Sequence, residues 1–195
     1  MKNAEKLNGE ARHLKIREPS PWVRRFAPLV RKGGAVLDVA CGGGRHSRLF
    51  LDLGHHVAAV DRDISHVAGL KGRIEVIEAD LEAEEPVFSG AGPLAGRRFA
   101  GVVVCNYLHR PLLPFLLGAL EEGGAFIYET FAEGNEHFSR PRNPDHFLKT
   151  GELLELTRGR LQVVAYEHGL VDKGPLPGVK QRIAAVHQDQ FAKML

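Results

Sequence analysis

The stretch VLDVACGGGRHS, residues 36 to 47, runs from an apolar segment through three consecutive glycines into residues that can open a helix. A glycine turn between a strand and a helix lets a ligand approach the backbone more closely than any Cβ would permit. The start of the following helix offers free N–H groups and a partial positive charge to an anionic group. This stretch therefore predicts a site for a nucleotide-type cofactor.

Three aspartates accompany the glycine turn: Asp38 inside the first apolar run, Asp61 at the end of the second and Asp80 at the end of the third. A carboxylate in the place of Asp61 can accept hydrogen bonds from both hydroxyls of a ribose, and one in the place of Asp80 from an adenine amine. Each acid alone is equally well explained as a strand-end cap or a surface charge. Open α/β sheets bind ligands along the carboxyl ends of their strands, so the three acids together indicate a ligand site more specifically than any one of them does.

Two cofactors compete for this site. The dinucleotide fingerprint G-x-G-x-x-G fits at Gly42 and Gly44 but has Ser47 in place of its third glycine. Asp38 is an awkward neighbour for a pyrophosphate and suits a cationic amino group. Both departures favour S-adenosylmethionine, with an NAD-dependent Rossmann oxidoreductase as the alternative.

The elements that must position these residues alternate between two kinds. Apolar runs rich in Val, Ile and Ala are typical of strands covered on both faces, and they lie at 35–40, 56–60, 74–79, 99–106 and 124–131. Helices are expected at 44–54, 64–72 and 110–121, the last with Pro111 in its first turn and Gly123 past its end. This alternation predicts an α/β doubly wound fold.

The polar segment after residue 131 breaks the alternation, and long connections without regular pattern are often functional. A helix is expected at 150–159, and two late strands flank DKGPLPG, which is too short for a crossover helix and so predicts an antiparallel hairpin. We predict one domain over residues 1–195. Its parts are an N-terminal helical arm (1–34), a cofactor-binding core (35–131), a lid loop (132–147), and a helix plus C-terminal hairpin (148–195).

The composition, 44% hydrophobic and 26% charged, is that of one globular domain rather than a disordered or membrane protein. The sequence has neither a signal-peptide core nor a run of about 18 apolar residues, so we expect a cytoplasmic protein with no membrane partner. Cys41 and Cys105 are too few for a disulfide scaffold, and no histidine or cysteine spacing fits a metal site, so no metal is expected.

Residues 1–32 hold nine Lys or Arg against three Glu, a net charge of +6 that leaves −4 for the rest of the chain. Such an arm could meet a nucleic acid or another anionic partner. A solvated amphipathic helix explains the same pattern and is the favoured interpretation.

The motifs VLDVACGGGRHS, AAVDRD, EVIEADLE, VVVCNYLHRP and LEEGGAFIYETF, across residues 35–131, resemble the class I S-adenosylmethionine-dependent methyltransferases. Within that group, CGGGRHS and YETF are most similar to small methyltransferases of the tellurite-resistance type. The resemblance implies a Rossmann-like methyltransferase fold of seven strands in the order 3-2-1-4-5-7-6, with strand 7 antiparallel, and S-adenosyl-L-methionine as the cofactor. The residues that it implies for cofactor binding are Asp38, Ala40, Cys41, Gly42, Gly44, His46, Asp61, Arg62, Asp80, Leu81 and Asn106.

Methyl transfer from a sulfonium is an in-line displacement, so alignment and exclusion of water can supply most of the acceleration. A base is needed only if the acceptor is protonated. We expect the acceptor beyond strands four and five, with His109 as the first candidate base and Glu129 and Tyr107 as further candidates, although a structural ion pair explains Glu129 as well. Candidate acceptor contacts are Arg110, Phe131, His137, Arg140 and Arg142.

The acceptor itself is expected to be a small molecule. CNYLHRP lacks the prolines of the D/N-P-P-Y/F segment found in enzymes that methylate base amines, which argues against that chemistry but leaves RNA or tRNA as an alternative. A cofactor-binding partner module without catalysis is a further alternative, because the cofactor motifs say little about the acceptor pocket.

Overall fold

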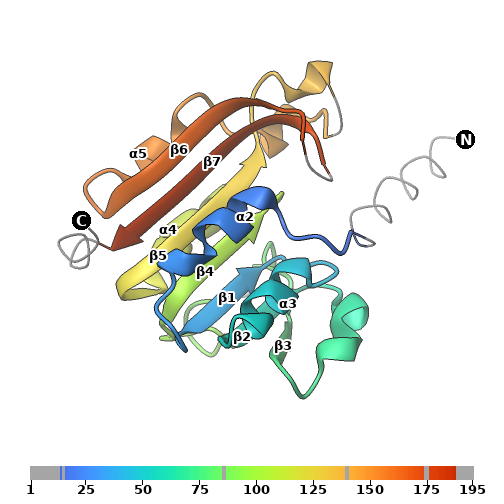
Figure 1. Cartoon of the computed structure of the whole chain (residues 1–195), viewed down its shortest axis with the longest axis vertical. Helices are drawn as coiled ribbons and strands as arrows, with labels where there is room; N and C mark the ends of the chain where they lie inside the picture. The colour runs from blue at the N-terminus through green and yellow to red at the C-terminus, as the bar shows by residue number, and fades with distance from the viewer. Residues whose placement is uncertain (1–13, 15, 85–86, 139–140, 174–175, 188–195) are drawn as a thin grey trace, which may run out of the picture.

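The computed structural model describes residues 14, 16–84, 87–138, 141–173 and 176–187. They form a seven-stranded sheet in the order β3-β2-β1-β4-β5-β7-β6, with helices on both faces (Figure 1). Strands β1 to β5 are parallel, and β7 runs antiparallel to both β5 and β6. The strands are β1 (Ala35–Val39), β2 (His56–Asp61), β3 (Glu75–Glu78), β4 (Phe99–Cys105), β5 (Leu120–Phe131), β6 (Leu161–Val171) and β7 (Gly178–His187).

The predicted doubly wound fold and its strand order are confirmed, and the physical reason is burial of the central strands on both faces. The helices are α2 (Pro21–Phe26), α3 (Arg45–Asp52), α4 (Leu113–Gly118) and α5 (Glu152–Thr157), with 3-10 turns η1 (Ala27–Leu29), η2 (Ile64–Leu70), η3 (Arg110–Leu112), η4 (Asn135–His137) and η5 (Pro144–His146). Trp22 and Phe50 belong to the core under α2 and α3, whereas Leu116 and Leu153 belong to the core under α4 and α5. Parallel strands covered in this way read as continuous apolar runs.

The helix predicted at 110–121 is wrong in extent. The segment divides into η3 and α4, each with a proline in its first turn, and α4 ends at Gly118. Proline is tolerated only in the first turn of a helix, so two prolines three residues apart make two short elements. Leu120 already pairs with Phe99 in the sheet, and Gly123, with φ +72°, lies inside β5 instead of closing a helix.

The segment predicted as a helix at 64–72 forms the 3-10 turn η2. The hairpin expected near the C-terminus is present as β6 and β7. No helix among the described residues is long and apolar enough to cross a membrane.

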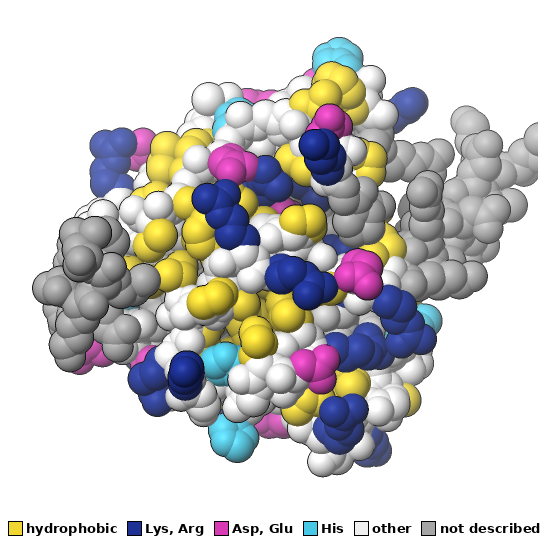
Figure 2. Space-filling model, in the orientation of Figure 1, with side chains coloured by type: hydrophobic (Ala, Val, Ile, Leu, Met, Phe, Trp, Pro, Cys, Tyr) yellow, Lys and Arg dark blue, Asp and Glu magenta, His cyan; other side chains and the backbone are white. Residues whose placement is uncertain are grey.

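The described part of the N-terminal arm is tied to the sheet. The indole N–H of Trp22 donates to the Ile183 carbonyl at 3.2 Å, so α2 is fixed over β7. Figure 2 shows Lys and Arg side chains over much of this face, with acidic side chains between them. Residues 1–13 and 15 of this arm, with four of its nine basic residues, lie outside the described residues.

Candidate functional site

The glycine turn lies at the carboxyl end of β1. Gly42 and Gly44 have φ values of +52° and +70°, which favour glycine because a Cβ would be strained there. The Gly42 N–H donates to Asp61 Oδ2 at 2.8 Å, so the end of β2 holds the turn in place. A Cβ at Gly43 would collide with the Leu14 carbonyl, so the N-terminal segment passes directly over the turn.

Two of the predicted acids face the carboxyl edge of the sheet. Asp61 is half-buried and also accepts the Asp63 N–H through Oδ1 at 3.1 Å. Asp80 is exposed and accepts the Glu82 N–H at 2.9 Å, beyond the end of β3. Each carboxylate oxygen can accept a second hydrogen bond, so both acids keep capacity for a ligand. Leu81, beside Asp80, is buried.

Asp38 is buried in β1 with 1% of its surface exposed. Its Oδ2 accepts a hydrogen bond from the Ser47 hydroxyl of α3 at 2.5 Å. Burial raises the pKa of Asp38 to about 6, against the lowering effect of the Ser47 hydrogen bond. Ser47 is the residue that stands in place of the third glycine of the dinucleotide fingerprint. Its hydroxyl thus gives a hydrogen-bond partner to Asp38, the buried acid that argues against a pyrophosphate.

His46 uses its side chain in the protein interior. Its Nε2 accepts the backbone N–H of Ser20 at 3.2 Å, which attaches the N-terminal segment to the start of α3. Burial lowers the pKa of His46 well below its ordinary value, so the ring stays neutral and can act as the acceptor. Cys41 is also buried, and burial raises the pKa of its thiol.

Two residues other than glycine adopt left-handed backbone at the ends of neighbouring strands. Ala40 follows β1 with φ +52°, and Asn106 follows β4 with φ +58°. Strands β1 and β4 are paired in parallel, so the two residues lie at the same edge of the sheet. Such conformations cost about 1 to 3 kcal/mol each and cluster at ligand sites.

Glu129 in β5 is 3% exposed and lies within a buried ion-pair network. Its Oε1 is 3.4 Å from Lys180 Nζ, and its Oε2 is 3.9 Å from Arg182 Nη1. The Cys105 thiol donates to Oε1 at 3.3 Å, and burial raises the pKa of this thiol to about 12. These contacts match the ion-pair explanation for Glu129, since a buried carboxylate needs such partners.

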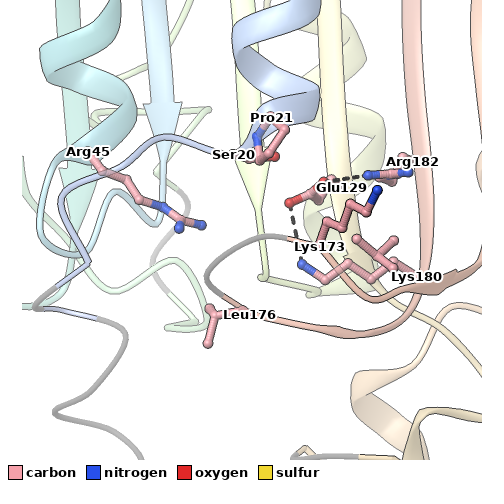
Figure 3. Close-up of a pocket in the computed structure, with 9 residues that line it drawn as sticks. Ser20, Pro21, Arg45, Glu129, Lys173, Leu176, Lys180 and Arg182 are labelled. Carbon is pink, nitrogen blue, oxygen red and sulfur yellow. Dashed lines mark hydrogen bonds and ion pairs between the residues drawn. The ribbon is translucent and has the colours of Figure 1, made fainter.

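A small cavity opens beside this network, lined from β5, β7 and the starts of α2 and α3 (Figure 3). Arg45 reaches into it from the start of α3, opposite Glu129, Lys180 and Arg182. Its lining residues are Ser20, Pro21, Arg45, Glu129, Val171, Lys173, Leu176, Lys180 and Arg182. Four cationic side chains therefore face the cavity together with a single carboxylate.

Solved structures with the same fold are S-adenosylmethionine-dependent methyltransferases. TehB from Haemophilus influenzae superposes with a TM-score of 0.65 at 17% identity, over 85% of this chain and 61% of its own. The 1,6-didemethyltoxoflavin-N1-methyltransferase of Burkholderia thailandensis, solved with that compound and S-adenosylhomocysteine bound, gives 0.63 at 22%, over 87% and 77%. A TehB-like enzyme from Corynebacterium glutamicum gives 0.62 at 17%, over 95% and 98%.

The chain has the Rossmann-like methyltransferase fold. It spans about three fifths of the length of TehB. No protein-family model matches the sequence, and neither does any curated protein. At these identities the similarity concerns the fold, so activity and acceptor rest on the site itself.

The candidate catalytic residues of this methyltransferase fold surround the end of β4. His109 is half-buried and immediately precedes η3. The Tyr107 hydroxyl is buried without a hydrogen-bond partner among the described residues. Burial, and then the negative charge of Glu82, raises the pKa of Tyr107, so its phenol stays protonated. The Tyr107 carbonyl accepts the Tyr128 hydroxyl at 2.7 Å.

The predicted acceptor contacts do not gather at the cavity. Arg110 forms a two-pronged ion pair with Glu152 at 2.7 and 2.9 Å, and it also donates to the carbonyls of Asp145 and Phe147. It therefore ties the loop before α5 to η3 and is not available for an acceptor. His137 and Arg142 are exposed, Phe131 is buried with Lys180 Nζ 5.0 Å from its ring centre, and Arg140 lies outside the described residues. Arg62, a predicted cofactor contact, is also exposed.

Sequence reasoning missed the cations of the cavity. Lys180 and Arg182 belong to a late strand, VKQRIAAV, whose apolar residues are its obvious feature. The signal for them was a pair of basic residues inside an otherwise buried strand, because such residues need partners. Within the described part of the chain, no group of three or more His, Cys, Asp or Glu side chains is placed to hold a metal ion.

Proposed function

We propose that this chain is an S-adenosylmethionine-dependent methyltransferase that acts on a small-molecule acceptor. The observation that carries the proposal is the hydrogen bond from the Gly42 N–H to Asp61, at the carboxyl edge of a sheet with an antiparallel β7. Dinucleotide-binding Rossmann sheets have the order 3-2-1-4-5-6, so both the sheet and Ser47 speak against the NAD alternative.

The residues at the edge of the sheet fit the cofactor by their chemistry. The Asp61 carboxylate would hold the ribose hydroxyls, and Asp80 with the Leu81 N–H would hold the adenine. The open backbone of the glycine turn, Gly42 to Gly44, and the strained residues Ala40 and Asn106 would contact the rest. Bound S-adenosylmethionine would supply a methyl group that its sulfonium charge already activates.

The protein's own contribution would be to align the acceptor and exclude water from the cavity. Glu129 is fully engaged by Lys180, Arg182 and Cys105, so it would position the wall of the cavity instead of accepting a proton. His109 is the remaining candidate base, needed only for a protonated acceptor. The small molecule bound to the Burkholderia thailandensis enzyme supports a small acceptor.

Calorimetry with S-adenosylmethionine, S-adenosylhomocysteine and NAD tests the cofactor. We expect binding of the first two, whereas micromolar binding of NAD alone would overturn the proposal. An isotope-transfer assay from labelled methyl donor into cell extract, divided into small-molecule, protein and RNA fractions, tests the acceptor. Label is expected in the small-molecule fraction; label in RNA would support the alternative acceptor, and none in any fraction would support a non-catalytic module.

A further inference from the structure

The carboxyl edge of the sheet is electrostatically divided. After β2 and β3, carboxylates outnumber cations, with Asp61, Asp63, Asp80, Glu82 and Glu84 against Arg62. Beside β5 and β7, the cations Arg45, Lys173, Lys180 and Arg182 outnumber the carboxylates of Glu129, which lines the same cavity, and Glu167, which pairs with Arg182. A ligand that has hydrogen-bond donors at one end and a carboxylate at the other is oriented by such an edge.

Arg45 stands apart from the other cations of the cavity. It is the first residue of α3, directly after the glycine turn, and only 8% of its surface is exposed. Its guanidinium donates to the Glu18 carbonyl at 3.5 Å and to Cys105 Sγ at 3.2 Å. Neither partner carries a formal charge, because burial holds the pKa of the Cys105 thiol at about 12.

No carboxylate among the described residues pairs with Arg45. Glu129 is engaged by Lys180 and Arg182, and the Asp38 carboxyl is bonded to Ser47. A buried guanidinium has five N–H donors, and leaving its charge without an anion is costly. Arg45 is therefore a buried cation that is arranged to receive an anion from outside the chain.

Resting on the proposed function, we propose that Arg45 binds the carboxylate of the methionine moiety of the cofactor. The donor-rich adenosine then lies toward Asp61 and Asp80, and the carboxylate lies toward the guanidinium between the glycine turn and the end of β4. An arginine fork suits a carboxylate because two parallel N–H groups can bond both oxygens. Arg45 would thus fix the direction in which the cofactor lies along the edge.

The test compares two ligands that differ only at the methionine end. S-adenosylhomocysteine carries the carboxylate, and 5′-methylthioadenosine lacks the whole amino-acid group. By calorimetry, Arg45→Met should weaken S-adenosylhomocysteine about 10- to 100-fold and change methylthioadenosine less than about threefold. Arg45→Lys, which keeps the charge without the fork, should give an intermediate loss.

Lys32→Met is the control, since it removes one positive charge from an exposed side chain that precedes β1, away from the carboxyl edge of the sheet. It should leave both affinities within about twofold of the wild type, because no buried contact is lost. Thermal melting of the Arg45 variants shows whether they fold. If Arg45→Met does not fold, Arg45→Lys still tests the inference.

Three results would overturn the inference. Equal weakening of both ligands would mean that Arg45 supports the glycine turn and contacts no carboxylate. Unchanged affinity for S-adenosylhomocysteine would mean that Arg45 serves another anion, such as an acidic acceptor. If the wild type bound neither ligand, the proposed function would fail together with the inference. In the first two cases the wild type still binds methylthioadenosine, so the inference fails and the proposed function is retained.

Discussion

The ammonium group of Lys180 donates a hydrogen bond to Asn106 Oδ1 at 2.9 Å while it lies 3.4 Å from Glu129 Oε1. One buried cation therefore links β7 to β5 and to the left-handed residue that ends β4. The strained backbone of Asn106 is held by this contact and by its own N–H, which donates to the Glu129 carbonyl at 2.8 Å.

Lys180→Met should lower the free energy of unfolding by about 3 to 5 kcal/mol, because it leaves the buried Glu129 carboxylate with the more distant Arg182 as its cationic partner. Adding Glu129→Gln to the variant should restore part of the loss, since the unpaired charge is then removed. Chemical denaturation measures both, with the exposed Lys32→Met as the control. If the stability losses of the two single variants add up to the loss of the double variant, the Lys180 and Glu129 side chains are not coupled.

The cavity illustrates what sequence reasoning reaches and what it does not. The strands, the glycine turn and the acids Asp61 and Asp80 follow from local pattern, because each depends on a few adjacent residues. The pairing of Glu129 with Arg182 and of Phe131 with Lys180 depends on the register between β5 and β7. Register is set by tertiary packing, and a slip of one residue would turn both cations to the other face.

Arg110 shows the converse difficulty. Its place near the end of β4 suggests an acceptor contact, and only the position of α5 shows that Glu152 already binds it. Lid behaviour of residues 132–147 stays a prediction, although the structure shows how the ends of the loop are fixed. Ala132 bridges to Leu148, and the Asn135 amide donates to the Pro141 carbonyl at 3.1 Å.

Asp38 should give the protein a distinctive dependence of stability on pH. The folded protein binds a proton at Asp38 more tightly than the unfolded chain, because burial raises the pKa from 3.8 to about 6. This group therefore lowers the free energy of unfolding as the pH rises from about 4 to about 6, by about 3 kcal/mol in total, and has no further effect above that range.

Asp38→Asn should remove this decrease, so the variant gains stability relative to the wild type between pH 4 and about 6 and keeps the gain at pH 7. His46, whose folded pKa is lowered, acts in the opposite direction below its ordinary pKa, but it is present in both proteins and cancels in the difference. Urea denaturation at a series of pH values gives the two curves. Parallel curves would mean that the Asp38 carboxyl titrates normally in the folded protein.

Asp61→Ala should weaken S-adenosylhomocysteine and methylthioadenosine alike, by about 1 to 3 kcal/mol, because both ligands carry the ribose and the variant leaves its hydroxyls unpaired. The Gly42 N–H also loses its acceptor, which loosens the turn. Asp63→Ala is the control, since its exposed carboxylate contacts only its own turn, where it accepts the Ser65 N–H and lies 3.5 Å from His66 Nε2 among the described residues. Calorimetry that showed a loss for one ligand alone would place Asp61 away from the ribose.

The loop from Phe131 to Phe147 should show its mobility in hydrogen exchange. Phe131 and Phe147 are buried, whereas Phe138 is 60% exposed, so we expect the ends to be protected and the middle to exchange faster than β4 and β5. Arg110 donates to two carbonyls near the end of this loop. It is therefore the side chain whose removal should free the loop.

Arg110→Met should raise the exchange of residues 144–148 about tenfold or more, which corresponds to the loss of one or two charge-assisted hydrogen bonds. Arg97→Met is the matched control because it breaks a similar two-pronged pair, with Glu75, on a distant part of the surface. It should leave this loop unchanged. If the middle of the loop is as protected as the central strands in the wild type, the segment is a fixed wall of the site and the lid hypothesis is wrong.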